Sequence, residues 1–492
     1  MGANAIIPRV TIVGGGFTGA SAAVQLVRAS PVAIEITVIE PRPRVGNGLA
    51  YSTNDQDHRL NAPMEGHLVD PSDPAALQRW CKKHQIAEND RGAVASDGSL
   101  FLRRKDFGAF VSDTVRSHAR SATGSKIQHL RDMATDVSPR AGAVDVRTRD
   151  GRLLTSELLV VATGNATPRL PAEFAENMSA SSAVVAVPTD LERVHQVPKS
   201  ARVLLIGSGL TALDVLSTML KSGHRGAITA ISRRGLRPHA NRPMTTAPDL
   251  DITRALLDRV EGPVASFIRE AGNPPTTLGL LRALRSQIRA VESTGDTWHT
   301  AFDELRDVVW QVWPTLPASE KKRFMKHLRS WWDVHRFRCP PQNDAMVRDA
   351  ERNGRVVFRA ARLHAVAEEA DGRIRVVLRD RGRHSLQTAH FDAVINCTGI
   401  DAAAGAQSNP FLASLYHTGS IRADDSGFGF AVDAGCRPIG EDCSANDSIR
   451  IFGPPNAGTF GDSFGAIFIA TQIRRALPNM LKTLEVLQSI NQ

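Results

Sequence analysis

A glycine loop near the N-terminus constrains the fold more than any other feature of the chain. Residues 9–20 read RVTIVGGGFTGA, an apolar strand followed by glycines in G-x-G-x-x-G spacing. These glycines are Gly14, Gly16 and Gly19. In a βαβ unit the first permits a tight turn, the second lets the backbone approach a pyrophosphate, and the third lets helix and strand pack closely.

The residues after this loop complete the pattern. Small apolar residues over 20–27 predict a helix pressed against a sheet, and an apolar strand over 34–39 ends in Glu40. An acid at this position accepts hydrogen bonds from an adenosine ribose, and the helix N-terminus offers unpaired N–H groups to phosphates. We therefore predict a dinucleotide site. The alternative is a glycine-rich turn in some other α/β fold.

A second glycine loop lies near the middle of the chain, where residues 201–215 read ARVLLIGSGLTALDV. Its G-x-G-x-x-A residues, with the threonine among them, are Gly207, Gly209, Thr211 and Ala212. The next apolar strand, over 227–231, leads into Arg233 and Arg234 instead of an acid. An acid would repel a 2′-phosphate, whereas arginines pair with it through charge-assisted hydrogen bonds. This predicts NADPH rather than NADH; a solvated strand end is the alternative.

Both loops are followed by further matching features. A β-rich stretch leads to the apolar segments 158–164 (LLVVATG) and 393–399 (AVINCTG), with DGR turns upstream at 150–152 and 371–373. The segments end at Thr163-Gly164 and at Thr398-Gly399. Small residues there let the chain pass close to a bound dinucleotide. This order predicts an α/β fold with two Rossmann-like dinucleotide-binding domains and β-meander crossovers.

The expected domain limits follow from these repeats. The first domain is discontinuous, over 1–168 and 346–492, and the second domain covers 169–345 with a helical insertion at about 243–338. The insertion has helical spacing of apolar residues and holds five of the six tryptophans, namely Trp298, Trp310, Trp313, Trp331 and Trp332. Such tryptophans indicate a packed core, with a substrate box as the alternative. The insertion either caps an active site or forms a dimer face.

The polar run WWDVHRFR at 331–338 has two interpretations. It is a structural ion cluster that links the insertion to the first domain, or its side chains reach a nicotinamide or an anionic substrate.

Composition excludes several classes of protein. A hydrophobic content of 42% and a charged content of 23% are those of a globular chain. The sequence contains no stretch of about 18 uncharged apolar residues, so we expect no membrane span. The net charge of +9 is spread along the chain, which argues against nucleic acid. The five cysteines form no C-x-x-C pair and no histidine cluster occurs, so neither a dithiol centre nor a metal site is expected. We expect a cytoplasmic enzyme.

Three further segments carry a family resemblance. They are GNGLAYST at 46–53, HRLNAP at 58–63 and WWDVHRFRCPP at 331–341. With the glycine loops and Thr-Gly turns, they make the chain similar to two-dinucleotide-binding-domain flavoproteins. Within that group it resembles the FAD/NADPH-dependent class B monooxygenases, including the lysine and ornithine N-hydroxylases, and above all a branch described simply as FAD/NAD(P)-binding proteins.

The resemblance implies where the cofactors bind. FAD would be held by residues of the first loop, the segments after it and the first Thr-Gly turn, namely Gly14, Gly16, Phe17, Thr18, Gly19, Glu40, Gly48, Tyr51, Asn61, Thr163 and Gly164. NADPH and the second turn would involve Gly207, Gly209, Thr211, Ala212, Arg233, Arg234, Thr398 and Gly399.

FAD binding is also implied to return near the C-terminus, at Gly453 and Asp462. The family pattern has an aspartate directly after the strand-ending glycine, whereas here Pro454 and Pro455 follow it. A helix N-cap is therefore the alternative role for Asp462.

The resemblance implies an NADPH-consuming monooxygenase that acts through a C4a-(hydro)peroxyflavin on the nitrogen, sulfur or carbonyl carbon of a small molecule, with O2 as co-substrate. Two alternatives stay open. One is a reductase that passes electrons to a quinone or protein acceptor without inserting oxygen, and the other is a non-enzymatic flavin-binding sensor. No catalytic base or acid is identified. No nucleic acid or membrane partner is expected, and self-association is left open.

Overall fold

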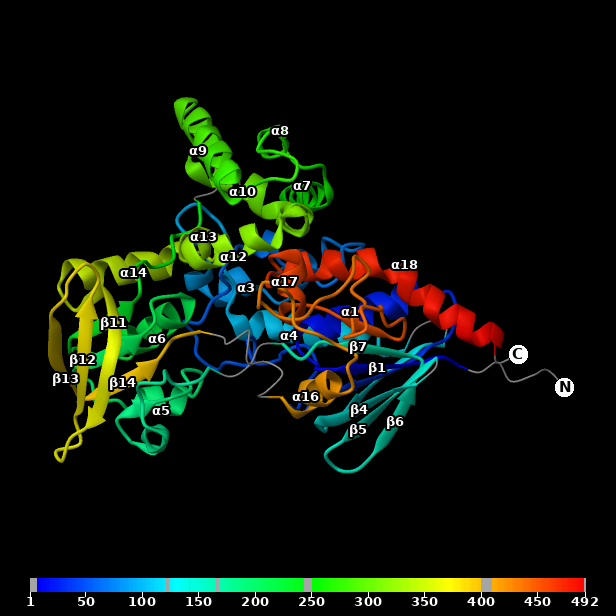
Figure 1. Cartoon of the computed structure of the whole chain (residues 1–492), viewed down its shortest axis with the longest axis horizontal. Helices are drawn as coiled ribbons and strands as arrows, with labels where there is room; N and C mark the ends of the chain where they lie inside the picture. The colour runs from blue at the N-terminus through cyan, green and yellow to red at the C-terminus, as the bar shows by residue number, and fades with distance from the viewer. Residues whose placement is uncertain are drawn as a thin grey trace.

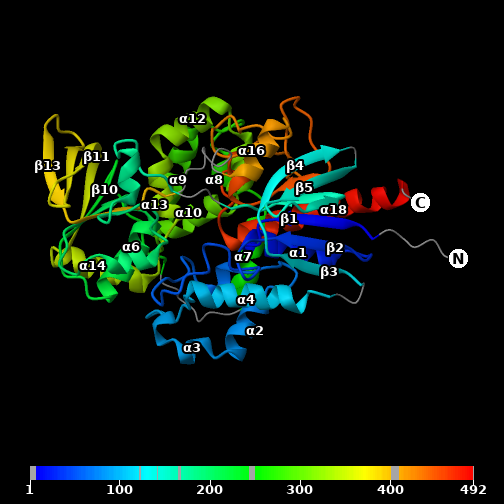
Figure 2. The same ribbon diagram turned by 90° about the horizontal axis from the view of Figure 1, so that it is seen from below.

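The computed structural model describes residues 7–120, 124–140, 142–164, 168–242, 250–399 and 409–490. The chain forms two sheet-containing parts, here called the first and second units, and a helical insertion that stands over their junction (Figure 1). The sheets of the first unit and the sheet of the second unit lie at opposite ends of the molecule (Figure 2).

The first unit is built on a five-stranded parallel sheet of order β15-β7-β1-β2-β3. Its strands are β1 (Arg9–Val13), β2 (Glu35–Ile39), β3 (Lys126–Leu130), β7 (Leu158–Val161) and β15 (Ile449–Ile451). β7 and β15 are buried along their whole length, as expected of parallel strands covered on both faces. Helix α1 (Phe17–Ala29) packs beside α18 (Ala466–Ile490).

A three-stranded antiparallel meander completes this unit. It consists of β4 (Ala134–Arg140), β5 (Ala143–Thr148) and β6 (Leu153–Ser156). The remaining elements are η1 (Met64–Gly66), α2 (Ala76–Lys83), α3 (Ile86–Asn89), η2 (Arg91–Ala93), α4 (Arg104–Ser117), α16 (Pro410–His417), η5 (Pro454–Asn456) and α17 (Ala457–Phe460).

The second unit has a seven-stranded sheet of order β13-β12-β11-β10-β9-β14-β8. Its strands are β8 (Val184–Val185), β9 (Val203–Ile206), β10 (Ile228–Ser232), β11 (Val356–Glu368), β12 (Ile374–Asp380), β13 (Leu386–Phe391) and β14 (Ala393–Asn396). Its helices are η3 (Glu176–Ala180), α5 (Leu191–Gln196), α6 (Leu210–Lys221) and α14 (Pro341–Arg352). Together the parallel sheets and meanders confirm the predicted α/β fold class.

The expected domain boundary at residue 346 needs correction. β11 to β14 lie beyond it, yet β11 pairs in parallel with β10 and β14 pairs in parallel with β9. The second unit therefore extends to Asn396. The local sequence does not show this boundary, because a meander that lengthens an existing sheet has the same local pattern as a separate one.

The two DGR turns have equivalent local geometry. Gly151 lies between β5 and β6 with φ of 84°, and Gly372 lies between β11 and β12 with φ of 81°. Glycine is favoured at both because other residues rarely adopt a positive φ.

In its described part the insertion consists of helices and the loops that connect them. It contains α7 (Leu250–Glu261), α8 (Ser266–Arg269), α9 (Thr277–Ser293), α10 (Trp298–Asp307), α11 (Val309–Val312), η4 (Trp313–Thr315), α12 (Ala318–His327) and α13 (Arg329–Arg336). Trp313 is buried, and its indole Nε1 donates to the carbonyl of Gly458 at 2.7 Å. The insertion is thereby attached to the first unit.

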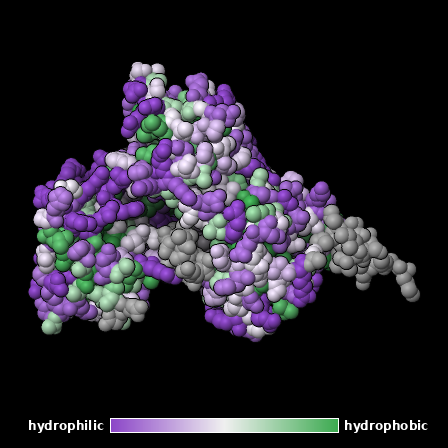
Figure 3. All heavy atoms as spheres, in the orientation of Figure 1, coloured by the Kyte–Doolittle hydropathy of each residue, from purple (hydrophilic) through white to green (hydrophobic). Residues whose placement is uncertain are grey.

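The viewed face of the molecule is largely hydrophilic, with apolar atoms in scattered patches (Figure 3). In the described residues no helix has the length and apolarity of a membrane span. All five cysteines are free thiols, and four of them are buried. The described residues bring together no group of three or more histidine, cysteine or acidic side chains that could hold a metal.

Candidate functional site

The first glycine loop brings three backbone segments into close approach. A Cβ added to Gly14, whose φ is 102°, would lie 2.3 Å from the carbonyl oxygen of Ala162 at the end of β7. A Cβ added to Gly19 would lie 2.0 Å from the carbonyl oxygen of Gly14. Both separations are shorter than any van der Waals contact, so these positions require glycine.

The N-terminus of α1 is open to an anion. Gly16 is its N-cap, no side chain caps the helix, and its first turn, which includes Phe17 and Thr18, holds no acid. The first-turn N–H groups therefore have no partner within the helix and carry the positive end of the helix dipole. Gly48, with φ of 51°, lies over this end, because a Cβ there would be 2.9 Å from Cα of Gly16.

Two more predicted residues lie beside this helix end. A Cβ on Gly453 would be 2.9 Å from Oγ1 of Thr18, which brings the C-terminal segment against α1. Thr163 follows β7, and its buried Oγ1 has no hydrogen-bond partner among the described residues. The next residue, Gly164, has φ of 75°.

Glu40 follows β2 and is 3% exposed. Its Oε2 accepts the Gly15 N–H at 3.0 Å, and its Oε1 accepts the Arg42 N–H at 2.9 Å. The carboxylate thus lies against the glycine loop. The uncapped helix end, the Gly16–Gly48 approach, this buried acid and the unpaired Thr163 hydroxyl fit a dinucleotide with its pyrophosphate at α1.

Tyr51 and Asn61 occupy different surroundings. The ring of Tyr51 packs edge-on to Phe107 with centroids 4.8 Å apart, and burial raises the pKa of its hydroxyl to about 12. The carbonyl of Asn61 accepts the Nδ2 hydrogen of Asn241 at 2.8 Å. Asn61 therefore lies at the junction of the units, whereas Tyr51 belongs to an aromatic cluster behind the helix end.

The second glycine loop repeats the geometry of the first. A Cβ on Gly207, whose φ is 117°, would lie 2.0 Å from the carbonyl oxygen of Cys397 at the end of β14. Gly209 is the N-cap of α6, again with no side-chain cap and no acid in the first turn. Thr211 and Ala212 belong to that turn, and Ala212 is buried.

The second Thr-Gly turn differs from the first in its hydrogen bonds. The Thr398 hydroxyl donates to Oδ1 of Asn396 at 2.8 Å, and Gly399 has φ of 84°. Unlike Thr163, Thr398 therefore has a partner within the chain.

The strand registers show how the charged strand ends correspond. Ile39 pairs with Val13 directly before the first loop, and Ile231 pairs with Ile206 directly before the second. Ser232 is therefore the counterpart of Glu40, and Arg233 follows it.

Arg233 and Arg234 have no acid within ion-pair distance among the described residues. Arg233 is exposed, and Arg234 donates to the carbonyl of His327 at 3.0 Å. By contrast, Arg237 contacts Asp344 at 2.6 Å. The two arginines keep their charge available for an anion.

Asp462 is not a helix N-cap. It is 4% exposed and pairs with Arg336 of α13, and its Oδ1 accepts the Phe464 N–H at 3.2 Å, whereas α18 begins only at Ala466. The neighbouring Ser463 hydroxyl is buried and has no hydrogen-bond partner in the part of the chain that the structure describes. Asp462 thus links the first unit to the insertion.

The WWDVHRFR run acts mainly through ion pairs. Besides the Arg336 contact, Asp333 binds Arg329 at 2.6 Å and Arg338 binds Asp303 at 2.6 Å. These contacts agree with the structural interpretation of the run.

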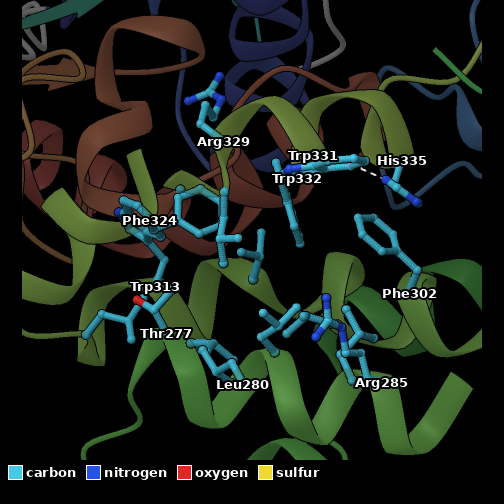
Figure 4. A pocket seen from close by; sticks show the side chains of 18 of the residues that line it. Thr277, Leu280, Arg285, Phe302, Trp313, Phe324, Arg329, Trp331, Trp332 and His335 are labelled. Atoms are coloured by element: carbon cyan, nitrogen blue, oxygen red, sulfur yellow. Dashed lines mark hydrogen bonds between the residues drawn. The ribbon is translucent and has the colours of Figure 1, made fainter. Parts of the chain in front are cut away.

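One site was missed in the sequence. A cavity of about 510 Å³ lies within the insertion and is walled on one side by Gly461 and Phe428 of the first unit (Figure 4). The sequence carries two signals for it, the helical spacing of apolar residues in the insertion and its tryptophans, of which Trp313, Trp331 and Trp332 line the cavity. The tryptophans predict a packed core, with a substrate box as the alternative, because helical periodicity does not reveal what a face packs against.

Comparisons with known proteins agree with this geometry. A family model described as FAD-NAD(P)-binding matches residues 11–166, and one described as L-lysine 6-monooxygenase/L-ornithine 5-monooxygenase matches residues 96–247. A search among curated proteins finds no match.

Solved structures with the same fold cover nearly the whole chain. L-lysine 6-monooxygenase from Pseudomonas syringae is 16% identical with a TM-score of 0.65, over 97% of this chain and 99% of that chain. The ornithine N-hydroxylase of Kutzneria sp. 744 is 17% identical with a TM-score of 0.61, over 98% and 100%. A thioredoxin reductase from Lactococcus lactis is 11% identical with a TM-score of 0.52, over 97% and 99%.

Proposed function

The chain has the two-dinucleotide-binding-domain flavoprotein fold and is distantly related to the lysine and ornithine N-monooxygenases, and from this premise we propose that it is an FAD-dependent, NADPH-consuming monooxygenase of a small molecule. The observation that carries the proposal is the duplicated loop geometry. In each unit a helix begins without a capping side chain. The turn before that helix contains a position that only glycine can occupy, Gly14 in the first unit and Gly207 in the second.

The first loop is proposed to bind FAD. The first-turn N–H groups of α1 bind the pyrophosphate, Glu40 accepts hydrogen bonds from the ribose, and the Thr163 hydroxyl donates to or accepts from the cofactor. Bound FAD supplies hydride acceptance and reaction with O2, which no protein side chain provides. The chain's own task is to orient the two cofactors and to exclude water.

The second loop is proposed to bind NADPH. The N-terminus of α6 takes the pyrophosphate, and Arg233 and Arg234 take the 2′-phosphate, for which their unpaired charges are suited. Ser232 stands at the position of Glu40, so no acid opposes that phosphate.

Oxygenation is favoured over electron transfer to a disulfide. The family model for lysine and ornithine monooxygenases matches 152 residues, from 96 to 247, and the Kutzneria enzyme was solved with reduced FAD, NADP+ and L-ornithine. A thioredoxin reductase shares the fold, but this chain has no C-x-x-C pair to act as a redox dithiol. Reduction of a quinone or a protein acceptor remains the second candidate.

The proposal is tested with purified full-length protein. It should take up FAD, be reduced by NADPH, and after mixing with O2 give a long-lived, blue-shifted absorption band. Immediate return of the oxidised spectrum without that band would favour the reductase. Material that cannot take up FAD would eliminate both enzymatic functions. A panel of amines, thioethers and ketones, tested for stimulation of NADPH oxidation without matching peroxide release, would identify the substrate.

A further inference from the structure

The insertion contains an apolar cavity of about 510 Å³ between α9 on one side and α10 to α13 on the other (Figure 4). This volume lies within the range of about 300–1,000 Å³ that small-molecule sites occupy. Its walls are aliphatic and aromatic side chains, among them Leu280, Leu284, Phe302 and Trp332.

The apolar face of α9 is accessible from this cavity. Of the 17 residues of α9, Thr277 is the only fully buried one, and Leu280, Leu281, Leu284 and Ile288 are each only partly buried. Across the cavity Trp331 is 43% exposed. A helix that packs against a protein core normally buries its apolar face. The apolar face of α9 is only partly buried, so it retains apolar area that a ligand can cover.

The charges at the cavity have one sign. None of the lining residues is acidic, and two are arginines. Arg329 lies on the far side of α13 in Figure 4 and is engaged by Asp333 at 2.6 Å. Arg285 points into the cavity, and in the described part of the chain no acid lies within ion-pair distance of it.

Two further polar side chains of the lining, Thr277 and His335, are also engaged, and the Thr277 hydroxyl donates to the carbonyl of Glu320 at 3.0 Å. Nδ1 of His335 lies 2.7 Å from the carbonyl oxygen of Trp331. Burial and the nearby Arg338 lower its pKa below the ordinary value, which keeps it uncharged at neutral pH. Arg285 is thus the one lining charge that is open to a ligand among the described residues.

The cavity reaches the first unit at the segment between α17 and α18. Gly461 forms part of its wall, and Asp462 and the unpaired Ser463 hydroxyl follow directly. A Cβ on Gly461 would lie 2.7 Å from Cγ of Trp313, so indole and backbone are in contact at this end. A molecule in the cavity therefore lies between a cationic rim and the segment that leads into α18.

We propose that this cavity binds an amphipathic small molecule with an aliphatic or aromatic body and an anionic group, which Arg285 receives. The apolar walls select the body through burial, and the lack of acidic lining residues disfavours ammonium groups such as a lysine or ornithine side chain. Binding of this ligand does not depend on the proposed function. Only the further step of regarding the ligand as the substrate rests on the proposed function.

Isothermal titration calorimetry of the full-length holoprotein with octanoate, decanoate and dodecanoate tests the proposal. Affinity should rise roughly threefold to fourfold per added methylene, the gain expected for a buried CH2. Dodecylammonium and L-ornithine should bind more weakly than dodecanoate. Saturable binding that shows no dependence on chain length, or that favours the ammonium compounds, would overturn the proposal.

Matched variants test the role of Arg285. Arg285→Glu should weaken dodecanoate binding by about tenfold or more, as when a charge-assisted contact is lost. Arg282→Glu, on the same helix and exposed but outside the cavity, should change it by less than about twofold. Equal effects of the two variants would overturn the assignment of the anionic group to Arg285.

FAD content and NADPH oxidation in the same preparations keep the two proposals separate. A flavin-loaded, NADPH-oxidising protein that does not bind dodecanoate contradicts this inference and leaves the proposed function intact. Protein that binds dodecanoate but cannot take up FAD refutes the proposed function, and the ligand is then not a substrate. Sedimentation velocity measures whether the chain self-associates. A second copy of the chain that occupies the cavity would also overturn the inference.

Discussion

Arg233 and Arg234 are the residues on which the choice of nicotinamide cofactor depends. They directly follow Ser232, which stands at the position of Glu40, and neither pairs with an acid in the described residues. The free guanidinium of Arg233 is the more exposed of the two.

Substitution of Arg233 by alanine should therefore separate the two nicotinamide cofactors. We expect a loss of about 1.5–3 kcal/mol in kcat/KM for NADPH, with little change for NADH, because only NADPH carries the 2′-phosphate. Steady-state kinetics with both cofactors measures this. Arg225→Ala is the control, because Arg225 precedes the N-terminal end of β10, whereas Arg233 follows its C-terminal end. A loss that is equal for NADPH and NADH would contradict the assignment.

The pair of Arg336 and Asp462 joins the insertion to the first unit, with side chains 10% and 1% exposed. Asp462→Asn should lower stability by roughly 3–5 kcal/mol, because it leaves a guanidinium buried without its counter-charge. The midpoint of thermal unfolding should fall accordingly. Arg373→Gln removes an ion pair whose two side chains are each 50% exposed, and that midpoint should not change. Unchanged unfolding of Asp462→Asn would show that the pair does not hold the insertion in place.

At the scale of elements, the fold presents two helices of the same design. α1 and α6 both begin at a glycine N-cap, both lack a capping side chain, and both follow a strand through a glycine with positive φ. The segment that differs is the loop over α1, where Gly48 approaches Gly16. We expect this approach to define the space available to the pyrophosphate.

Replacing Gly48 by alanine should weaken FAD binding by about tenfold or more, which corresponds to about 1.4 kcal/mol. The added Cβ meets the backbone of Gly16 at 2.9 Å, so the loop must move away from the helix end. Flavin content after gel filtration and titration of the apoprotein with FAD measure the effect. Gly151→Ala provides the control, since Gly151 also has a positive φ but has nothing within 4 Å of its Cβ. If both variants retain FAD equally, the approach of Gly48 has no role in binding.

At the scale of the molecule, the second unit is joined both to the first unit and to the insertion. Arg104 of α4 binds Asp214 of α6 at 2.7 and 3.0 Å, and Asn241 donates to Asn61. The insertion meets the second unit at an aromatic cluster, in which the rings of His239 and His335 lie 4.6 Å apart. His299 stacks on Trp298 in the same cluster at 3.8 Å.

This cluster should make the stability of the molecule depend on pH. Burial, with the charge of Arg338 second, lowers the pKa of His299 to about 4, whereas an unfolded histidine has a pKa of about 6.5. Between these values the unfolded state binds more protons, so stability is lost as pH falls from about 6.5 toward about 4. Thermal unfolding between pH 7 and pH 4.5 measures it. His299→Gln should reduce that loss, and substitution of the exposed His384 should leave it unchanged. An unaltered pH dependence in His299→Gln would contradict the role of the cluster.

Much of the fold could be predicted because its signals are local. Glycine spacing, apolar strands and small helical residues are properties of adjacent residues, and the strands and helices around both loops formed where they were expected. The domain boundary could not be placed in the same way. Whether β11 joins β10 depends on pairing between residues about 128 positions apart, such as Ile228 with Val356.

By itself, the sequence determined that two strand–glycine loop–helix units occur in order, one ending in an acid and one in arginines. Local sterics and charge are sufficient for that. Only the tertiary structure decided that Asp462 pairs with Arg336 instead of capping α18, and that the apolar face of α9 encloses a cavity with Arg285 at its edge. Those outcomes depend on which distant surfaces meet, and a contact between such surfaces has no signature in the local order of residues.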